Sequence, residues 1–132
     1  MKAQSCPCCS QKPYTSCCKP FVSGQALPAT PEQLMRSRYT AYTQANIDYI
    51  VATMKGDALN KFDRNSATAW AKQSTWLNLQ VLSASATHSN SQEGFVEFIA
   101  SFQNQGKIEC LSEKSRFVKE KGQWFYTDGQ HN

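Results

Sequence analysis

Residues 95–102, Phe-Val-Glu-Phe-Ile-Ala-Ser-Phe, are the stretch that decides the fold class. Apolar side chains recur at every second position, the pattern of a strand with one buried face, on Val96, Phe98, Ala100 and Phe102. The alternation continues on both sides of this stretch. It predicts three more strands, at residues 76–81, 108–119 and 123–127. Turn signals between the last strands, at 104–107 and 121–122, indicate an antiparallel meander.

Helical patterns precede the strands. Thr30 can cap a helix, Pro31 suits its first position, and Gln33 can complete a capping box. This helix is predicted to run to about residue 45. Two shorter helices should follow, one from the cap Asn46 to about residue 54, ended by Gly56, and one at 66–73. Helices followed by a run of strands indicate an α+β fold, with the helices covering one face of the sheet.

The first twenty residues hold two close pairs of cysteines, Cys6-Pro7-Cys8 and Cys17-Cys18. Two such pairs can supply the four vertices of a tetrahedral metal site. The segment has few apolar side chains, so a metal must stabilise it. We therefore expect one structural Zn²⁺ in a knuckle over residues 1–24, followed by a domain over residues 25–132. Residues 21–30, which hold Gly24 and Pro28, are expected to be a connector across this boundary. The expected ligands are Cys6, Cys8, Cys17 and Cys18.

Charge and hydropathy exclude several classes of protein. The net charge is +4 over 132 residues, and the basic residues are scattered. Direct nucleic-acid binding is therefore not expected. No stretch approaches the roughly 18 consecutive apolar residues of a membrane span, and no apolar signal segment follows Lys2. Clustered thiols that bind metal need a reducing compartment, so we expect a cytoplasmic protein without a membrane partner.

The cysteine pairs resemble the SEC-C zinc motif, best known from the tail of the SecA translocation ATPase. The rest of the chain is similar to the bacterial YchJ family in five stretches, at residues 34–42, 48–49, 95–98, 113–117 and 124–129. The resemblance implies an NTF2-like cone, in which a curved sheet wraps around helices and encloses a cavity, preceded by the zinc knuckle. It implies no defined reaction.

One departure from the SEC-C pattern concerns the ligands. The motif usually continues Gly-Ser-Gly, whereas this chain has Cys9-Ser10-Gln11. If the first glycine serves a left-handed backbone, Cys9 would cost about 1–2 kcal/mol there. The fifth thiol also leaves open whether Cys9 replaces one of the four ligands or serves as a reactive cysteine.

Arg38 lies in the middle of the apolar face of the first predicted helix. A guanidinium there must meet a carboxylate or reach water. Glu113 is the first candidate partner, and Glu97 and Asp128 are the alternatives. The pair either fixes helix against sheet or belongs to a ligand cavity. The residues expected at that cavity are Arg38, Tyr42, Glu113, Ser115, Trp124, Tyr126 and Asp128.

Three other side chains are expected to have no part in a functional site. Cys110 follows Ile108 in a strand pattern and is expected to be a small buried side chain. His88 and His131 are expected at the surface, away from any acid–base motif.

Two functions from different classes remain. In the first, the knuckle presents Lys12, Tyr14 and Lys19 to a protein or ribonucleoprotein partner, as the resemblance to the SecA tail implies. In the second, the cavity binds a small molecule or performs acid–base catalysis, with Glu113 or Asp128 as the acid or base. A homodimer through the open face of the sheet is a further alternative.

Overall fold

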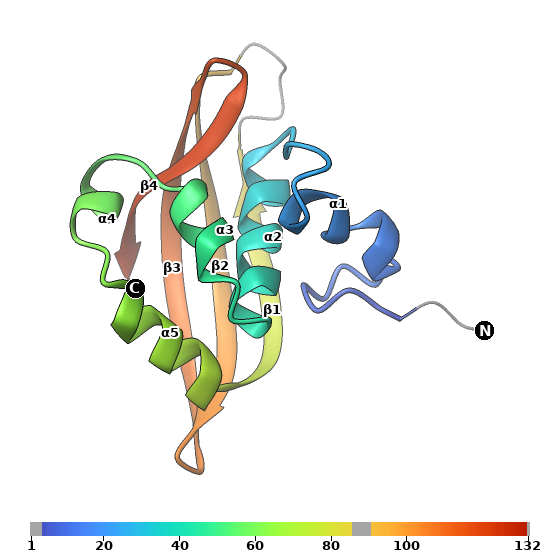
Figure 1. Ribbon diagram of the computed structural model, residues 1–132, viewed down its shortest axis with the longest axis vertical. Helices are drawn as coiled ribbons and strands as arrows, with labels where there is room; N and C mark the ends of the chain where they lie inside the picture. Colours follow the sequence, from blue (N-terminus) through green and yellow to red (C-terminus); the bar gives the residue numbers. More distant parts are fainter. Residues whose placement is uncertain (1–3, 86–90, 132) are drawn as a thin grey trace.

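The computed structural model describes residues 4–85 and 91–131 and has the predicted α+β architecture (Figure 1). The helical elements come first, in this order: the 3₁₀ helix η1 Tyr14–Ser16, then α1 Lys19–Val22, α2 Pro31–Thr43, α3 Ile47–Ala52, α4 Gly56–Asn60 and α5 Arg64–Gln73. Four strands follow: β1 Thr75–Ala84, β2 Glu93–Asn104, β3 Lys107–Glu120 and β4 Gln123–His131. No described helix has the length and apolar character needed to cross a bilayer.

The strands form one antiparallel sheet in the order β1-β2-β3-β4, which confirms the predicted meander. Both tight turns use left-handed backbone, at Gln105-Gly106 and at Lys121-Gly122. Such turns match the right-handed twist of the strands that they join. The alternation of β2 is also confirmed, because Val96, Phe98, Ala100 and Phe102 are all buried.

Helix α2 is the central element of the helical layer, and the other helices lie with it on one face of the sheet (Figure 1). One side of α2 packs on the sheet through Leu34, Met35 and Tyr39. Other side chains meet different neighbours, since Ser37 hydrogen-bonds the Tyr49 hydroxyl of α3 at 2.7 Å. The helix is therefore buried well beyond the single face that its sequence pattern predicts.

The start of α2 confirms the cap, with one change of detail. The Gln33 amide N–H donates to Thr30 Oγ1 at 3.1 Å, while Gln33 Oε1 accepts from the Ala29 N–H at 2.7 Å. The reciprocal bond of the capping box therefore reaches one residue further back than expected. The connector predicted at residues 21–30 is partly helical, because α1 extends to Val22.

The prediction that Gly56 ends the second helix was wrong. Helix α3 stops at Ala52, because the chain then pairs with β4: the Tyr126 N–H donates to Thr53 O at 2.8 Å and the Lys55 N–H donates to Tyr126 O at 2.9 Å. Gly56, at φ +68°, instead begins α4. No sequence signal for α4 was found, and long-range pairing decides where α3 ends.

Cys110 was also predicted wrongly, because its side chain is exposed. Leu111 and Glu113, the odd-numbered neighbours of Cys110 on β3, line the cavity under the helices, so Cys110 points to the opposite face of the sheet. Ile108, two residues before Cys110, shares that face and is 69% exposed. His88 and the side chain of His131 lie outside the described part of the structure.

Candidate functional site

The four predicted cysteines come together. Their Sγ atoms all lie within 4.8 Å of one another; the Cys8–Cys17 distance is 3.6 Å and the Cys17–Cys18 distance 4.0 Å. Four thiolates bound at ~2.3 Å to a tetrahedral ion would lie ~3.8 Å apart. The donor set therefore fits a tetrahedral metal ion, and these four residues could hold one.

Short local elements place these thiols. A tight loop carries the first pair, closed by the Cys6 N–H donating to Lys12 O at 2.9 Å. Cys17 follows η1, and Cys18 is the N-cap of α1. Cys9 adopts φ +66°, the left-handed conformation that glycine would adopt without cost. Its Sγ turns away from the cluster and accepts the Leu79 N–H of β1 at 3.4 Å.

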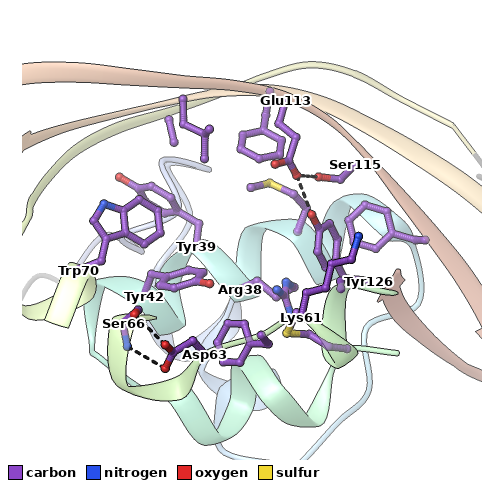
Figure 2. A pocket seen from close by; sticks show the side chains of 18 of the residues that line it. Arg38, Tyr39, Tyr42, Lys61, Asp63, Ser66, Trp70, Glu113, Ser115 and Tyr126 are labelled. Carbon is purple, nitrogen blue, oxygen red and sulfur yellow. Dashed lines mark hydrogen bonds between the residues drawn. The ribbon is translucent and has the colours of Figure 1, made fainter. Parts of the chain in front are cut away.

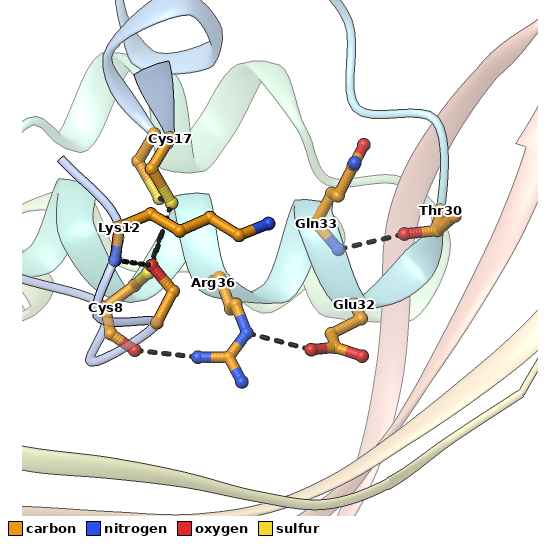
Figure 3. A network of polar contacts seen from close by, with 9 residues as sticks. Cys8, Lys12, Cys17, Thr30, Glu32, Gln33 and Arg36 are labelled. Carbon is orange, nitrogen blue, oxygen red and sulfur yellow. Dashed lines mark hydrogen bonds and ion pairs between the residues drawn. The ribbon is translucent and has the colours of Figure 1, made fainter. Parts of the chain in front are cut away.

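The cysteine cluster is attached to α2 on the flank that carries Arg36 (Figure 3). Arg36 donates from Nη1 to Cys8 O and from Nε to Glu32, both at 2.9 Å. Cys6 Sγ lies 3.7 Å from Thr40 Oγ1. Cys6, Cys8 and Cys18 are at most 4% exposed and share a hydrophobic cluster with α2 and sheet residues. The knuckle thus packs as part of the core.

Neighbouring thiols also polarise one another. The hydrogen bond from Cys18 lowers the pKa of Cys8 to about 4, and the same contact raises the pKa of Cys18. Burial raises the pKa of Cys17. Without a metal, Cys8 is therefore favoured as a thiolate, while Cys17 and Cys18 stay protonated. Binding of a metal cation would displace those protons. Because four protein ligands fill a tetrahedron, such a site leaves no position for a reacting water.

A second candidate site is a cavity of about 500 Å³ between the sheet and the helices α2, α4 and α5 (Figure 2). Its walls are mainly apolar and aromatic: Met35, Tyr39, Tyr42, Met54, Trp70, Trp76, Phe98, Ala100, Leu111 and Phe117. Its inner polar groups are Arg38, Glu113, Ser115 and Tyr126. Exposed Lys61, Asp63 and Ser66 lie at its solvent side.

Five of the seven residues predicted for the cavity line it: Arg38, Tyr42, Glu113, Ser115 and Tyr126. Trp124 does not, because its 1% exposed side chain packs in the core and its Nε1–H donates to Ala29 O at 3.2 Å. Asp128 is exposed and lies 3.9 Å from Arg116. An irregularity in the β3–β4 register, between Arg116 and Phe117, turns Asp128 away from the face that carries Tyr126.

The same irregularity makes room for Glu113. It brings Gly129 toward the inner face, where a Cβ would lie 2.4 Å from Glu113 Oε2. Ser115 Oγ donates to that oxygen at 2.5 Å and the Tyr126 hydroxyl donates at 3.1 Å. A larger residue at position 129 would therefore displace the Glu113 carboxylate from this position.

Arg38 meets Glu113 through Tyr126. The guanidinium carbon lies 4.7 Å from the centroid of the Tyr126 ring, a cation–π contact. Nη1 donates to Ile50 O at 2.9 Å and to Thr53 Oγ1 at 2.7 Å. Ile50 O lies in the last turn of α3 and also accepts from Thr53 Oγ1 at 3.1 Å, so the partner of Arg38 is a backbone carbonyl rather than the carboxylate that the sequence predicts. Burial lowers the pKa of Arg38 below its ordinary value.

Sequence reasoning missed the side of the cavity that is formed by α4, α5 and the segment between them. Lys61 and Asp63 belong to the segment between α4 and α5, for which the sequence offers no periodic signal. Trp70 and Trp76, two of the three tryptophans of the chain, flank the junction of α5 with β1. Their clustering at a helix–strand junction was the one signal that could have indicated an aromatic wall.

Comparison with known proteins shows which family has this architecture. Residues 30–129 match the family model described as the middle NTF2-like domain of YchJ. The chain belongs to the YchJ family. A UPF0225 protein of Vibrio parahaemolyticus is 45% identical over 127 residues, which cover 96% of this chain and 75% of that protein. The predicted NTF2-like fold with an N-terminal SEC-C-type segment is thereby confirmed.

Two solved structures support the same assignment. The solution structure of a SEC-C motif containing protein from Rhodopseudomonas palustris has a TM-score of 0.87 and 38% identity, covering 96% of this chain and 98% of that one. The crystal structure of a SEC-C motif containing protein from Psychrobacter arcticus has a TM-score of 0.79 and 30% identity, covering 95% and 81%. The YchJ fold and its cysteine segment therefore occur together in solved relatives.

Proposed function

We propose that this YchJ-family protein binds a small molecule in the cavity between α2 and the sheet, and that a metal-bound knuckle holds α2 in place. The observation that carries this proposal is the pair of buried charges, Arg38 and Glu113, which face an aromatic cavity of about 500 Å³. That volume lies within the range of about 300–1,000 Å³ typical of ligand sites.

The alternative, a purely structural ion pair, explains this arrangement less well. A buried pair that fixes helix against sheet gains most from direct contact in a dry interior. Here Tyr126 lies between the two charges, and both residues also border the cavity (Figure 2). Burying charges costs free energy, and a bound polar ligand would offset part of that cost.

We further propose that the metal is a single structural Zn²⁺ held by Cys6, Cys8, Cys17 and Cys18. Four thiolates in tetrahedral spacing suit Zn²⁺. The thiols must stay reduced to bind it, which supports the cytoplasm as the compartment. The gap between the end of α1 at Val22 and the start of α2 at Pro31 supports a boundary near residue 24.

Blocking the cavity tests the proposed function. Ala58 lines the cavity from α4, so Ala58→Trp should weaken binding of cavity ligands at least tenfold, because the indole occupies their space. Ala69→Trp on α5 is the matched control, since Ala69 is exposed and outside the lining. Ligand-observed NMR of a fragment library would measure both. If no fragment binds the wild type, or if hits bind Ala58→Trp equally well, the proposal is wrong.

A second candidate function is docking of a protein or ribonucleoprotein through the knuckle. Its outer surface supports this, because Lys12 and Lys19 are exposed there and Leu27, in the following segment, is 59% exposed. We expect the double variant Lys12→Glu, Lys19→Glu to lose partners that the wild type retains in affinity capture. Lys72→Glu on α5 is the control. Identical sets of captured partners for all three proteins would contradict the docking function.

A further inference from the structure

We propose that the cavity accepts an aromatic monocarboxylate, with the carboxylate on Arg38 and the ring against Trp70 and Trp76. This inference rests on the proposed function and names the chemical class of its ligand. It draws on three features of the cavity: the unused donors of Arg38, the balance of charge, and the aromatic wall.

The first feature is the state of the Arg38 guanidinium. The residue is only 8% exposed, and Nη1 donates to Ile50 O and Thr53 Oγ1. Within the described part of the chain, Nε and Nη2 have no hydrogen-bond partner. These two nitrogens form one edge of the guanidinium fork, which matches the two oxygens of a carboxylate. Neither nitrogen is sealed off from the cavity that Arg38 lines, so an anion at this edge would receive two charge-assisted hydrogen bonds.

The second feature limits the charge of the ligand. Four side chains that line the cavity carry a formal charge: Arg38 and Lys61 are cationic, and Glu113 and Asp63 are anionic. Their formal charges cancel. A monoanion adds one negative charge at Arg38, whereas a phosphate dianion adds two near Glu113 in a mainly apolar space. Like charges at short distance in a low-dielectric interior are strongly unfavourable, so the geometry selects a monoanion.

The third feature selects an aromatic body. Trp70 and Trp76 lie edge to face, with ring centroids 5.0 Å apart at 76°. Tyr42 packs against Trp70 at 5.2 Å and 66°, and Tyr39 against Trp76 at 5.7 Å and 81°. All four rings line the cavity, on the side where Figure 2 places Trp70, Tyr39 and Tyr42. Ring faces and edges arranged in this way accept a further planar ring in stacked or edge-to-face contact.

Three probes with the same naphthyl ring test the inference: 2-naphthoate, the neutral and nearly isosteric 2-naphthamide, and the larger, dianionic 2-naphthyl phosphate. Binding is followed by calorimetry and by the indole N–H signals of Trp70 and Trp76 in ¹H–¹⁵N spectra. We expect 2-naphthoate to bind at least tenfold more tightly than either other probe and to shift both indole signals. Equal affinity for 2-naphthamide, or tighter binding of the phosphate, would overturn the carboxylate assignment.

Two variants distinguish the effect of charge on ligand binding from an effect of the substitution on folding. Arg38→Met should reduce 2-naphthoate binding at least tenfold and leave 2-naphthamide binding unchanged. Because Arg38 also holds the end of α3, Glu113→Gln provides an independent measure: removal of the nearby negative charge should tighten 2-naphthoate binding about threefold or more. Arg116→Met, on the outer face beside Glu93, is the control. If Glu113→Gln leaves 2-naphthoate binding unchanged or weakens it, the inference fails.

The ligand class and the proposed function fail in different ways. If library fragments bind in a manner sensitive to Ala58→Trp while 2-naphthoate does not bind, the cavity is a ligand site and only the aromatic carboxylate is wrong. If no compound binds in a manner sensitive to Ala58→Trp, the proposed function fails and this inference fails with it.

Discussion

Cys8→Ser is expected to abolish binding of the proposed Zn²⁺ and to lower the melting temperature by about 10 °C or more. Cys8 is fully buried and its Sγ lies 3.6 Å from that of Cys17. Structural zinc contributes about 10–16 kcal/mol in small zinc-binding peptides. Loss of only about 3 kcal/mol of that would shift the melting temperature by about 10 °C in a domain of this size.

Native mass spectrometry and thermal melting with and without chelator measure this result. Cys110→Ser is the matched control, because Cys110 is an exposed thiol on β3, outside the cluster. The effect should extend to α2, since Arg36 holds Cys8 O; amide hydrogen exchange within α2 should accelerate in Cys8→Ser. A Cys8→Ser protein that still carries one zinc ion and melts like the wild type would contradict the four-thiolate site.

Trp124→Ala is expected to lower the free energy of unfolding by about 3–5 kcal/mol, because it removes a large, fully buried side chain. It also removes the donor to Ala29 O, which ties β4 to the segment before α2. Phe125→Ala is the control with a smaller expected loss, since Phe125 is half-buried and is covered by Lys55. Urea denaturation measures both.

This experiment also decides what Trp124 does. The sequence reading placed it at the cavity, whereas its side chain packs in the core. Under conditions in which the Trp124→Ala variant is still folded, it should therefore bind cavity fragments like the wild type. If Trp124→Ala instead lowered the free energy of unfolding by less than about 1 kcal/mol and abolished fragment binding, Trp124 would have to be assigned to the cavity.

Features that depend on neighbours in the chain were predictable. The period of two in β2, the Thr30 cap of α2 and the Asn46 cap of α3 all appear as expected. The pairs Cys6–Cys8 and Cys17–Cys18 belong to this class as well, because each pair lies within three residues and one short loop joins them. Periodicity, capping and ligand spacing act over a few residues, so the sequence displays them directly.

The cavity depended on contacts that the sequence does not display. Pairing with β4 ends α3 at Ala52 and allows α4 to form one wall. The same stretch supplies Ile50 O and Thr53 Oγ1, the partners that replaced a direct carboxylate for Arg38. Helix ends and buried polar groups must find hydrogen-bond partners. Those partners can lie far away in the sequence, so the local sequence pattern does not identify them.

The sequence by itself determined the four-strand meander, the caps of α2 and α3 and the grouping of cysteines into two pairs. Only the tertiary structure decided that Asp128 faces away from the cavity and that Gly129 lies beside Glu113. The physical reason is the register of β3 against β4. One irregular position reverses which side chains point inward, and its location depends on packing between strands rather than on the pattern within either one.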